Sequence, residues 1–152
     1  MKLVEITGDI FENPRECYMQ CISADFKMGL GIAKDFRDRF HVKDKLTTKW
    51  GNYQSYFKKD GGGAIATTDP LVVSLVTKLN YYDKPTYESM DISLKQAAML
   101  LEAWEVFEVS MPMIGCGLDK LNWDKVKKLI EKNFKYKQML ITVYKKGADS
   151  NG

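Results

Sequence analysis

The stretch Leu71-Val72-Val73-Ser74-Leu75-Val76-Thr77 decides the fold of this 152-residue chain. Almost all of its side chains are apolar, whereas a strand with one face in water alternates between apolar and polar residues. A continuous apolar run of this length is typical of a strand buried on both faces, as in a sheet with helices packed on either side. The stretch therefore predicts a central strand of an α/β fold.

Strands and helices alternate around this central strand. Further strands are predicted where short apolar runs are bounded by turn residues, at residues 3–7, 16–22, 64–68, 106–111 and 139–144. Helices are predicted where apolar residues recur every three or four positions, at 32–40, 85–104 and 122–134, with Pro85 and Asn122 at the two later starts. The pattern predicts one three-layer α/β/α domain with a central sheet of about six strands.

Two parts of the chain give weaker signals. Residues 42–56 fit no single pattern, although 43–49 are compatible with a short helix. The run Lys58-Lys59-Asp60-Gly61-Gly62-Gly63 is a turn or hairpin signal, so the sheet is predicted to be mixed. The domain is expected to span residues 1–145, and the small polar residues of 146–152 predict a flexible tail.

The composition is that of a globular, intracellular protein. No run approaches the ~20 apolar residues that a membrane-spanning helix needs, and no signal peptide is evident. Three cysteines and one histidine lack zinc-site spacing, so we expect no metal and a reducing, cytoplasmic setting. The net charge of +3 is too small to indicate nucleic-acid binding by itself, but it is compatible with an anionic small ligand.

Two glycine loops, Gly29-Leu30-Gly31 and Gly115-Cys116-Gly117, each follow a predicted strand and precede a predicted helix. A single loop of this kind is more often only a turn. Two of them at the carboxyl ends of strands can present backbone N–H groups to phosphates, since glycine has no side chain in the way. Neither loop completes a P-loop or a dinucleotide-binding fingerprint. The pair therefore predicts a cleft for a diphosphate.

Three stretches together resemble the macro domain family over about residues 3–144. They are Thr7-Gly8-Asp9-Ile10, Met28-Gly29-Leu30-Gly31-Ile32-Ala33, and the run from Ser110 to Asp119. Within the family, the chain looks most like the terminal ADP-ribose protein glycohydrolase branch. That likeness is carried by Cys21-Ile22-Ser23, Leu75-Val76-Thr77-Lys78, Lys84-Pro85-Thr86-Tyr87-Glu88 and Ile114-Gly115-Cys116-Gly117-Leu118-Asp119.

The resemblance implies a binding site for ADP-ribose, with no additional cofactor. Asp9 would accept a hydrogen bond from the adenine amino group, with Ile10 beside it. Tyr144, near the end of the last strand, would pack on the adenine side. The ribose, phosphate and diphosphate contacts would come from Ser23, Gly29, Gly31, Ile32, Ile114, Gly115, Cys116, Gly117 and Leu118.

The resemblance also implies a catalytic pair, Lys78 and Asp119. The lysine would attack C1″ of the distal ribose and form a covalent intermediate, which the aspartate would help to resolve. A lysine is nucleophilic only when neutral, and burial favours the neutral form. Without the family pattern, Lys78 would be interpreted as a solvated charge at a strand end, and Asp9 as a turn residue.

The expected function is a hydrolase that removes ADP-ribose from a protein, a nucleic acid or a metabolite such as an acetyl ester. Three alternatives remain open at this stage: a phosphatase acting on ADP-ribose 1″-phosphate, a non-catalytic ADP-ribose reader, and a nucleic-acid binder using a basic face. Tyr81 and Tyr82 would either cover the distal ribose or pack locally. A monomer is expected.

Overall fold

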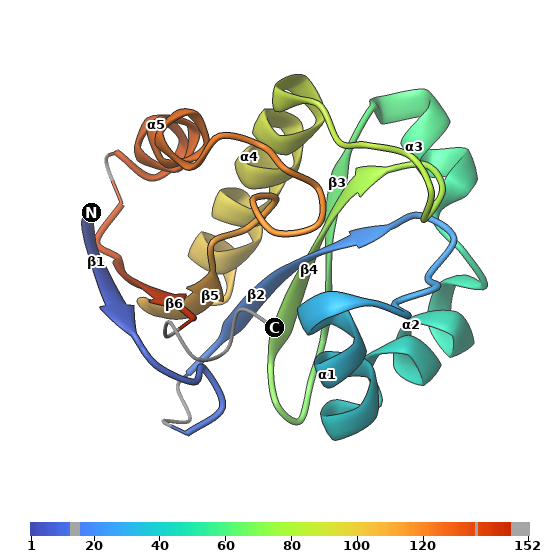
Figure 1. The fold of residues 1–152 in the computed structure, drawn as a ribbon, viewed down its shortest axis with the longest axis horizontal. Helices are drawn as coiled ribbons and strands as arrows, with labels where there is room; N and C mark the ends of the chain where they lie inside the picture. Colours follow the sequence, from blue (N-terminus) through green and yellow to red (C-terminus); the bar gives the residue numbers. More distant parts are fainter. Residues whose placement is uncertain (13–15, 136, 147–152) are drawn as a thin grey trace.

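The computed structural model describes residues 1–12, 16–135 and 137–146, which contain both strands and helices (Figure 1). Within these residues the chain forms six strands and five helices. In chain order they are β1 (Lys2–Thr7), β2 (Tyr18–Ser23), α1 (Gly31–Phe40), α2 (Val42–Trp50), α3 (Gln54–Asp60), β3 (Gly63–Thr67), β4 (Val72–Lys78), α4 (Tyr87–Ala103), β5 (Glu108–Pro112), α5 (Trp123–Phe134) and β6 (Leu140–Lys145).

The strands form a single mixed sheet in the order β1-β6-β5-β2-β4-β3. Neighbouring strands run parallel, except that β3 pairs antiparallel with β4. The exception follows from chain length, because the few residues between β3 and β4 suffice for a hairpin, whereas a parallel pair needs a crossover. The predicted six-stranded mixed sheet is confirmed.

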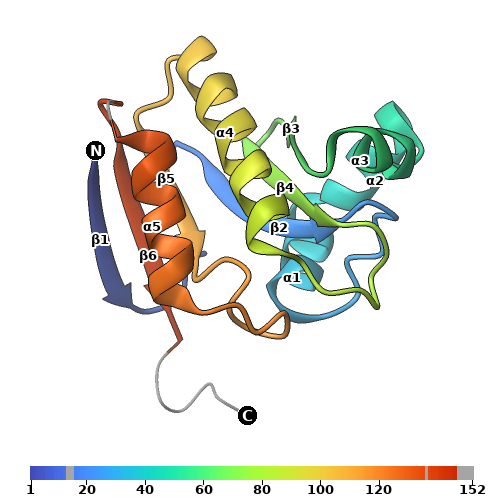
Figure 2. The same ribbon diagram turned by 90° about the horizontal axis from the view of Figure 1, so that it is seen from above.

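Strand β4 is buried on both faces, as its apolar run predicts. Val73 and Leu75 belong to one hydrophobic cluster, and Val72 and Val76 belong to another on the opposite face. Helices α4 and α5 contribute buried side chains to the first cluster, whereas α1 and α2 contribute buried side chains to the second. The sheet therefore lies between two helical layers: in Figure 1, α4 and α5 lie above it and α1 and α2 below it, and Figure 2 looks onto the layer of α4 and α5.

The segment with the weakest pattern forms two helices rather than one. Helix α2 covers most of the region that is compatible with a helix, but α3 is not predicted by the sequence pattern. Gly61 ends α3 in the left-handed conformation, with φ of 80°, so it caps a helix and does not form a hairpin turn. The hairpin instead uses the turn between β3 and β4.

The starts of α4 and α5 follow local capping chemistry. The Asn122 side chain accepts a hydrogen bond from the backbone N–H of Lys125, which confirms the predicted cap of α5. At α4 the cap is Thr86, which exchanges hydrogen bonds with Ser89, and Pro85 lies one residue earlier. No helix in the described part of the chain is long and apolar enough to cross a membrane. The predicted tail, apart from Lys146, lies outside the described residues.

Asp91 on α4 joins this helix to α5 and should make the stability of the fold depend on pH. It accepts hydrogen bonds from Lys132 at 2.9 Å and Asn133 at 2.8 Å. Burial opposes the charged form of Asp91, but these two bonds and the charges of Lys132 and Lys95 together outweigh it and hold its pKa below the usual 3.8. A lowered pKa in the folded state stabilises the fold above the unfolded-state pKa, and this contribution is lost as pH falls through the folded-state value.

We therefore expect Asp91→Asn to lower the free energy of unfolding by about 1 kcal/mol at pH 7. The difference from the wild type should shrink as pH falls below 3.8, since the wild-type carboxylate then becomes protonated. Urea denaturation at several pH values measures both effects. Glu131→Gln, at an exposed position on α5, is the control. A deficit that stays constant with pH would contradict this explanation.

Candidate functional site

The predicted site residues meet at one edge of the sheet. Strands β1, β6, β5, β2 and β4 run parallel, so their carboxyl ends lie side by side in that order. The loops that follow β1, β2 and β5 carry Asp9, both glycine loops and Asp119. In open α/β sheets this edge is the usual place for a ligand.

Lys78 and Asp119 form an ion pair, although they are 41 residues apart in the sequence. The Nζ atom of Lys78, the last residue of β4, lies 2.8 Å from Oδ1 of Asp119 in the loop after β5. The side chains keep only 15% and 17% of their surface exposed. The structure therefore brings the two predicted catalytic residues into direct contact in a partly desolvated position.

The second glycine loop has a fixed backbone. Gly115 adopts φ of 72°, a conformation that favours glycine, and its carbonyl accepts a hydrogen bond from the Leu121 N–H at 2.8 Å. Ile114 is 1% exposed and anchors the start of the loop in the core. By contrast, a Cβ at Gly117 would meet no atom within 4 Å. Gly115 therefore has a structural role, whereas Gly117 borders open space.

The first glycine loop lies next to the second. Gly31 begins α1 with φ of 61°, and a Cβ built on it would lie 3.4 Å from Cδ1 of Leu118. Leu30 occupies the cap position of α1, where no side chain accepts from the first N–H groups of the helix. Gly29 borders open space. The two loops therefore face each other, and the positive end of α1 is available to an anion between them.

The adenine end predicted at β1 combines one exposed side chain with two buried ones. Asp9 is exposed, and its Oδ1 accepts a hydrogen bond from the Phe11 N–H at 2.9 Å. Ile10 and Tyr144 are 3% and 5% exposed and belong to the same hydrophobic cluster. Within the described residues the Tyr144 hydroxyl has no hydrogen-bond partner. Asp9 can thus offer a carboxylate to a ligand, whereas Ile10 and Tyr144 lie in the core and leave little surface for one.

Two curated proteins resemble almost the whole chain. The human and bovine proteins named ADP-ribose glycohydrolase OARD1 are each 37% identical over 145 residues, covering 94% of this chain and 91% of the relative. The chain belongs to the macro domain family. No family model matches the sequence.

Solved macro domain structures share the fold. The DarG macrodomain of Mycobacterium tuberculosis superposes with a TM-score of 0.78 at 16% identity, covering 96% of this chain and 98% of that one. The DarG macrodomain of Thermus aquaticus gives a TM-score of 0.72 at 21% identity, with 93% and 97% covered. Thermosipho africanus DarTG in complex with ADP-ribose gives 0.76 at 14% identity, covering all of this chain and 43% of that one.

Asp25 organises the site of this macro domain, although no sequence pattern points to it. Its Oδ1 accepts hydrogen bonds from the Ser23 hydroxyl at 2.5 Å and the Lys27 N–H at 3.1 Å, and its Oδ2 accepts from the Tyr81 N–H at 2.9 Å. Asp25 therefore joins the loop after β2 to the loop after β4. Ser23 is buried and directs its hydroxyl to Asp25, so its predicted role in ligand contact remains a prediction.

Lys84 is a second residue to which sequence reasoning assigned no role of its own. Its Nζ donates a hydrogen bond to the backbone carbonyl of Leu118 at 3.0 Å. The bond ties the loop after β4 to the residue directly before Asp119. The Lys-Pro-Thr-Tyr run that contains Lys84 belongs to the family resemblance, and this was the one signal that could have found it.

The cysteines near the site are unsuited to nucleophilic chemistry. Burial raises the pKa of Cys116 to about 11, so its thiol stays protonated near neutral pH. Burial likewise raises the pKa of the Cys21 thiol, and the nearby Asp119 carboxylate acts in the same direction. The described residues contain no cluster of His, Cys, Asp and Glu side chains that could hold a metal ion. The Lys78–Asp119 pair is therefore the better candidate for chemistry.

The two glycines of the second loop should respond differently to alanine. Gly115→Ala places a Cβ in the left-handed region, 2.8 Å from Cε of Met90 and 3.0 Å from Cδ1 of Leu121, so we expect a loss of about 2 kcal/mol in unfolding free energy. Gly117→Ala should stay within about 0.5 kcal/mol of the wild type, because its Cβ has free space. Urea denaturation measures both, and equal losses would contradict this division of roles.

Proposed function

We propose that this macro domain binds ADP-ribose and hydrolyses the bond between its distal ribose and an acyl-linked acceptor. The observation that carries the proposal is the Lys78–Asp119 ion pair, in which Asp119 follows the second glycine loop by two residues. Support comes from the human and bovine relatives, which are named ADP-ribose glycohydrolases, and from the DarTG neighbour solved with ADP-ribose.

The strand order suggests how the ligand lies. Asp9 follows β1 and would accept a hydrogen bond from the adenine amino group. The loop from Ile114 to Leu118 follows β5 and would wrap the diphosphate with its N–H groups, opposite Gly29, Gly31 and Ile32 after β2. Lys78 ends β4 on the far side of β2, which would place it at the distal ribose.

The reaction would use the ion pair in two steps. Asp119 takes a proton from Nζ of Lys78, and the neutral amine attacks C1″ of the distal ribose. The bond from C1″ to the acyl oxygen breaks, and its electron pair leaves with the acceptor carboxylate. Asp119 passes this proton to the departing carboxylate and, ionised again, takes a proton from a water molecule that attacks C1″. The bond from C1″ to Nζ of Lys78 breaks, which releases ADP-ribose, and the proton on Asp119 returns to the Lys78 amine.

Removal of either member of the pair should abolish turnover while leaving binding. We expect Lys78→Ala and Asp119→Asn each to lower the rate of ADP-ribose release from a glutamyl-linked peptide by about 100-fold or more. ADP-ribose affinity, measured by calorimetry, should change less than about tenfold, because the ligand's other contacts remain.

The wild type must be measured beside these variants on three substrates: the acyl-linked peptide, the acetyl ester of ADP-ribose, and ADP-ribose 1″-phosphate. Binding without turnover of any substrate would make the protein a reader and defeat the hydrolase proposal. Phosphate release from ADP-ribose 1″-phosphate, without cleavage of the acyl-linked peptide or the acetyl ester, would establish the phosphatase alternative. Undiminished release by Lys78→Ala would defeat the proposed mechanism.

Asp9 should determine affinity at the other end of the ligand. We expect Asp9→Ala to weaken ADP-ribose binding by about 10-fold to 100-fold, the cost of one hydrogen bond to a charged acceptor. An analogue with hypoxanthine in place of adenine lacks the amino group, so its affinity should be low for the wild type and hardly changed by the variant. Calorimetry with both ligands measures these affinities. An equal loss of affinity for both ligands in Asp9→Ala would exclude the hydrogen bond between Asp9 and the adenine amino group.

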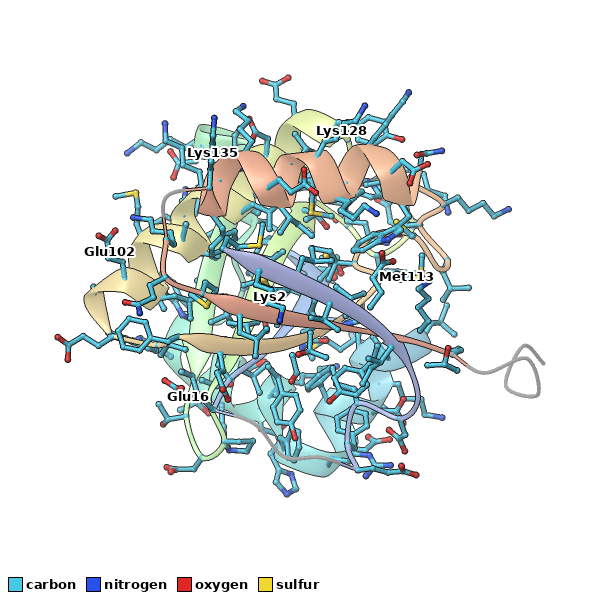
Figure 3. The ribbon with its side chains drawn as sticks, turned by 90° about the vertical axis from the view of Figure 1, so that its left-hand side faces the viewer. Lys2, Glu16, Glu102, Met113, Lys128 and Lys135 are labelled. Carbon is cyan, nitrogen blue, oxygen red and sulfur yellow. The ribbon has the colours of Figure 1, made fainter. Side chains whose placement is uncertain are left out.

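The lysines of α5 and the following loop give little support to a nucleic-acid-binding function. Several lysines of α5 and the following loop pair with carboxylates: Lys127 with Glu5, Lys132 with Asp91, and Lys137 with Glu102. Lys128 lies on the outer side of α5, away from the sheet (Figure 3). A face whose charges are largely paired has little net potential to attract a phosphate backbone.

We also propose that the protein is monomeric and cytoplasmic. The size of the domain supports the first statement, and the cysteine pattern supports the second.

A further inference from the structure

We infer that a cavity beside Lys78 is the binding site for the acceptor, and that it takes a peptide carrying the ADP-ribosylated carboxylate. The cavity has a volume of about 470 Å³ and is bordered by Phe57, Lys78, Leu79, Asp83, Lys84 and Glu88. It lies between the end of α3, the loop after β4 and the first turn of α4. This inference rests on the proposed function and names the substrate side of the same site.

The position of the cavity follows from the strand order. The proposed ligand runs from β1, where Asp9 would hold adenine, to β4, where Lys78 would meet C1″. The strand beyond β4 is β3, and the cavity reaches Gly61, which joins α3 to β3. A group bonded to C1″ that continues in the direction of the ligand therefore enters this cavity.

The lining suits a peptide better than a nucleic acid. Phe57 and Leu79 offer apolar surface, whereas Lys84, Asp83 and Glu88 offer charges of both signs. The two lysines and two carboxylates of the lining give it no net charge, so it offers little attraction to a phosphate backbone. A peptide brings amide groups and side chains of mixed polarity, which match such a surface.

Lys84 connects the cavity to the reaction centre. It borders the cavity, and its Nζ lies 3.0 Å from the carbonyl oxygen of Leu118, the neighbour of Asp119. An ammonium group there can stabilise the carboxylate that leaves C1″ with the electron pair of the broken bond. The start of α4 does not compete for this anion, because Thr86 and Ser89 already exchange hydrogen bonds there.

Filling the cavity tests the inference. Glu88 is exposed on the first turn of α4 and borders the cavity, so Glu88→Trp should obstruct it without touching the ADP-ribose cleft. Glu131→Trp adds the same side chain at an exposed position on α5 and serves as the control. The substrates are a glutamyl-ADP-ribosylated peptide and ADP-ribose acetylated at the 1″ position, which has the same leaving chemistry but no peptide.

We expect Glu88→Trp to slow hydrolysis of the peptide by about tenfold or more, the effect of losing roughly 1.4 kcal/mol of binding. Hydrolysis of the acetyl ester and affinity for ADP-ribose should change less than twofold, and Glu131→Trp should match the wild type. Unchanged peptide hydrolysis would overturn the inference. So would equal slowing of both substrates, or slowing of an ADP-ribosylated oligonucleotide but not of the peptide.

Lys84 variants test the leaving-group role separately. Lys84→Met should slow the acetyl ester more than an ester of a stronger acid, since a better leaving group needs less stabilisation, and Lys84→Arg should restore part of the rate. If Lys84 only supported the structure of the loop, its removal would slow both esters equally, and that result would overturn the leaving-group role. If the wild type hydrolyses neither the peptide nor the acetyl ester, the proposed function fails and the inference fails with it. If it hydrolyses both, the proposed function stands, and the variants alone decide whether the cavity binds the acceptor.

Discussion

The parallel alignment of β1, β6, β5, β2 and β4 is the constraint on which the site depends. Parallel strands end at the same edge, so residues that follow different strands become neighbours without any local sequence relation. Asp9, both glycine loops, Lys78 and Asp119 all use this geometry. The antiparallel β3 gives β4 a second neighbour, so that the strand carrying Lys78 is hydrogen-bonded on both sides.

Hydrogen bonds between loops then fix the positions of the residues that the sheet brings to one edge. Asp25 receives three hydrogen bonds and joins the loops after β2 and β4. Lys84 joins the loop after β4 to the one after β5. The Gln54 side chain donates to Asn80 at 2.8 Å and so ties the same β4 loop to α3. This loop is held from three sides, which gives a site on loops the positional precision that catalysis needs.

The sequence predicted the fold well where burial sets the pattern. The apolar run of β4 and the amphipathic helices α1, α4 and α5 were located correctly, because periodicity reflects which faces are buried. Helix α3 was not predicted, since its seven residues bury no side chain and therefore leave no apolar stripe.

In the site, too, the sequence predicted the residues that carry a local pattern and missed those defined by contacts between distant segments. The family resemblance selected Lys78 and Asp119, and the structure places them in contact. Asp25 could not be predicted, because its decisive partner, the Tyr81 N–H, is 56 residues away and any residue except proline offers that donor. The cavity beside Lys78 is likewise invisible in the sequence, since it arises from the relative positions of α3, a loop and α4.

The ion pair carries a cost that bears on the proposed chemistry. A partly buried Lys–Asp pair gains Coulomb energy but loses hydration, so its net contribution to folding is small and its retention is weak evidence for a structural role. A lysine amine is a nucleophile only when it is neutral, so an ion pair of this kind has to exchange a proton before it can react. Proton transfer to Asp119 converts two opposite charges into two neutral groups, a change that a drier site favours. Under the proposed function, a ligand between the glycine loops that displaces water from the ion pair would therefore promote the neutral, nucleophilic form of Lys78.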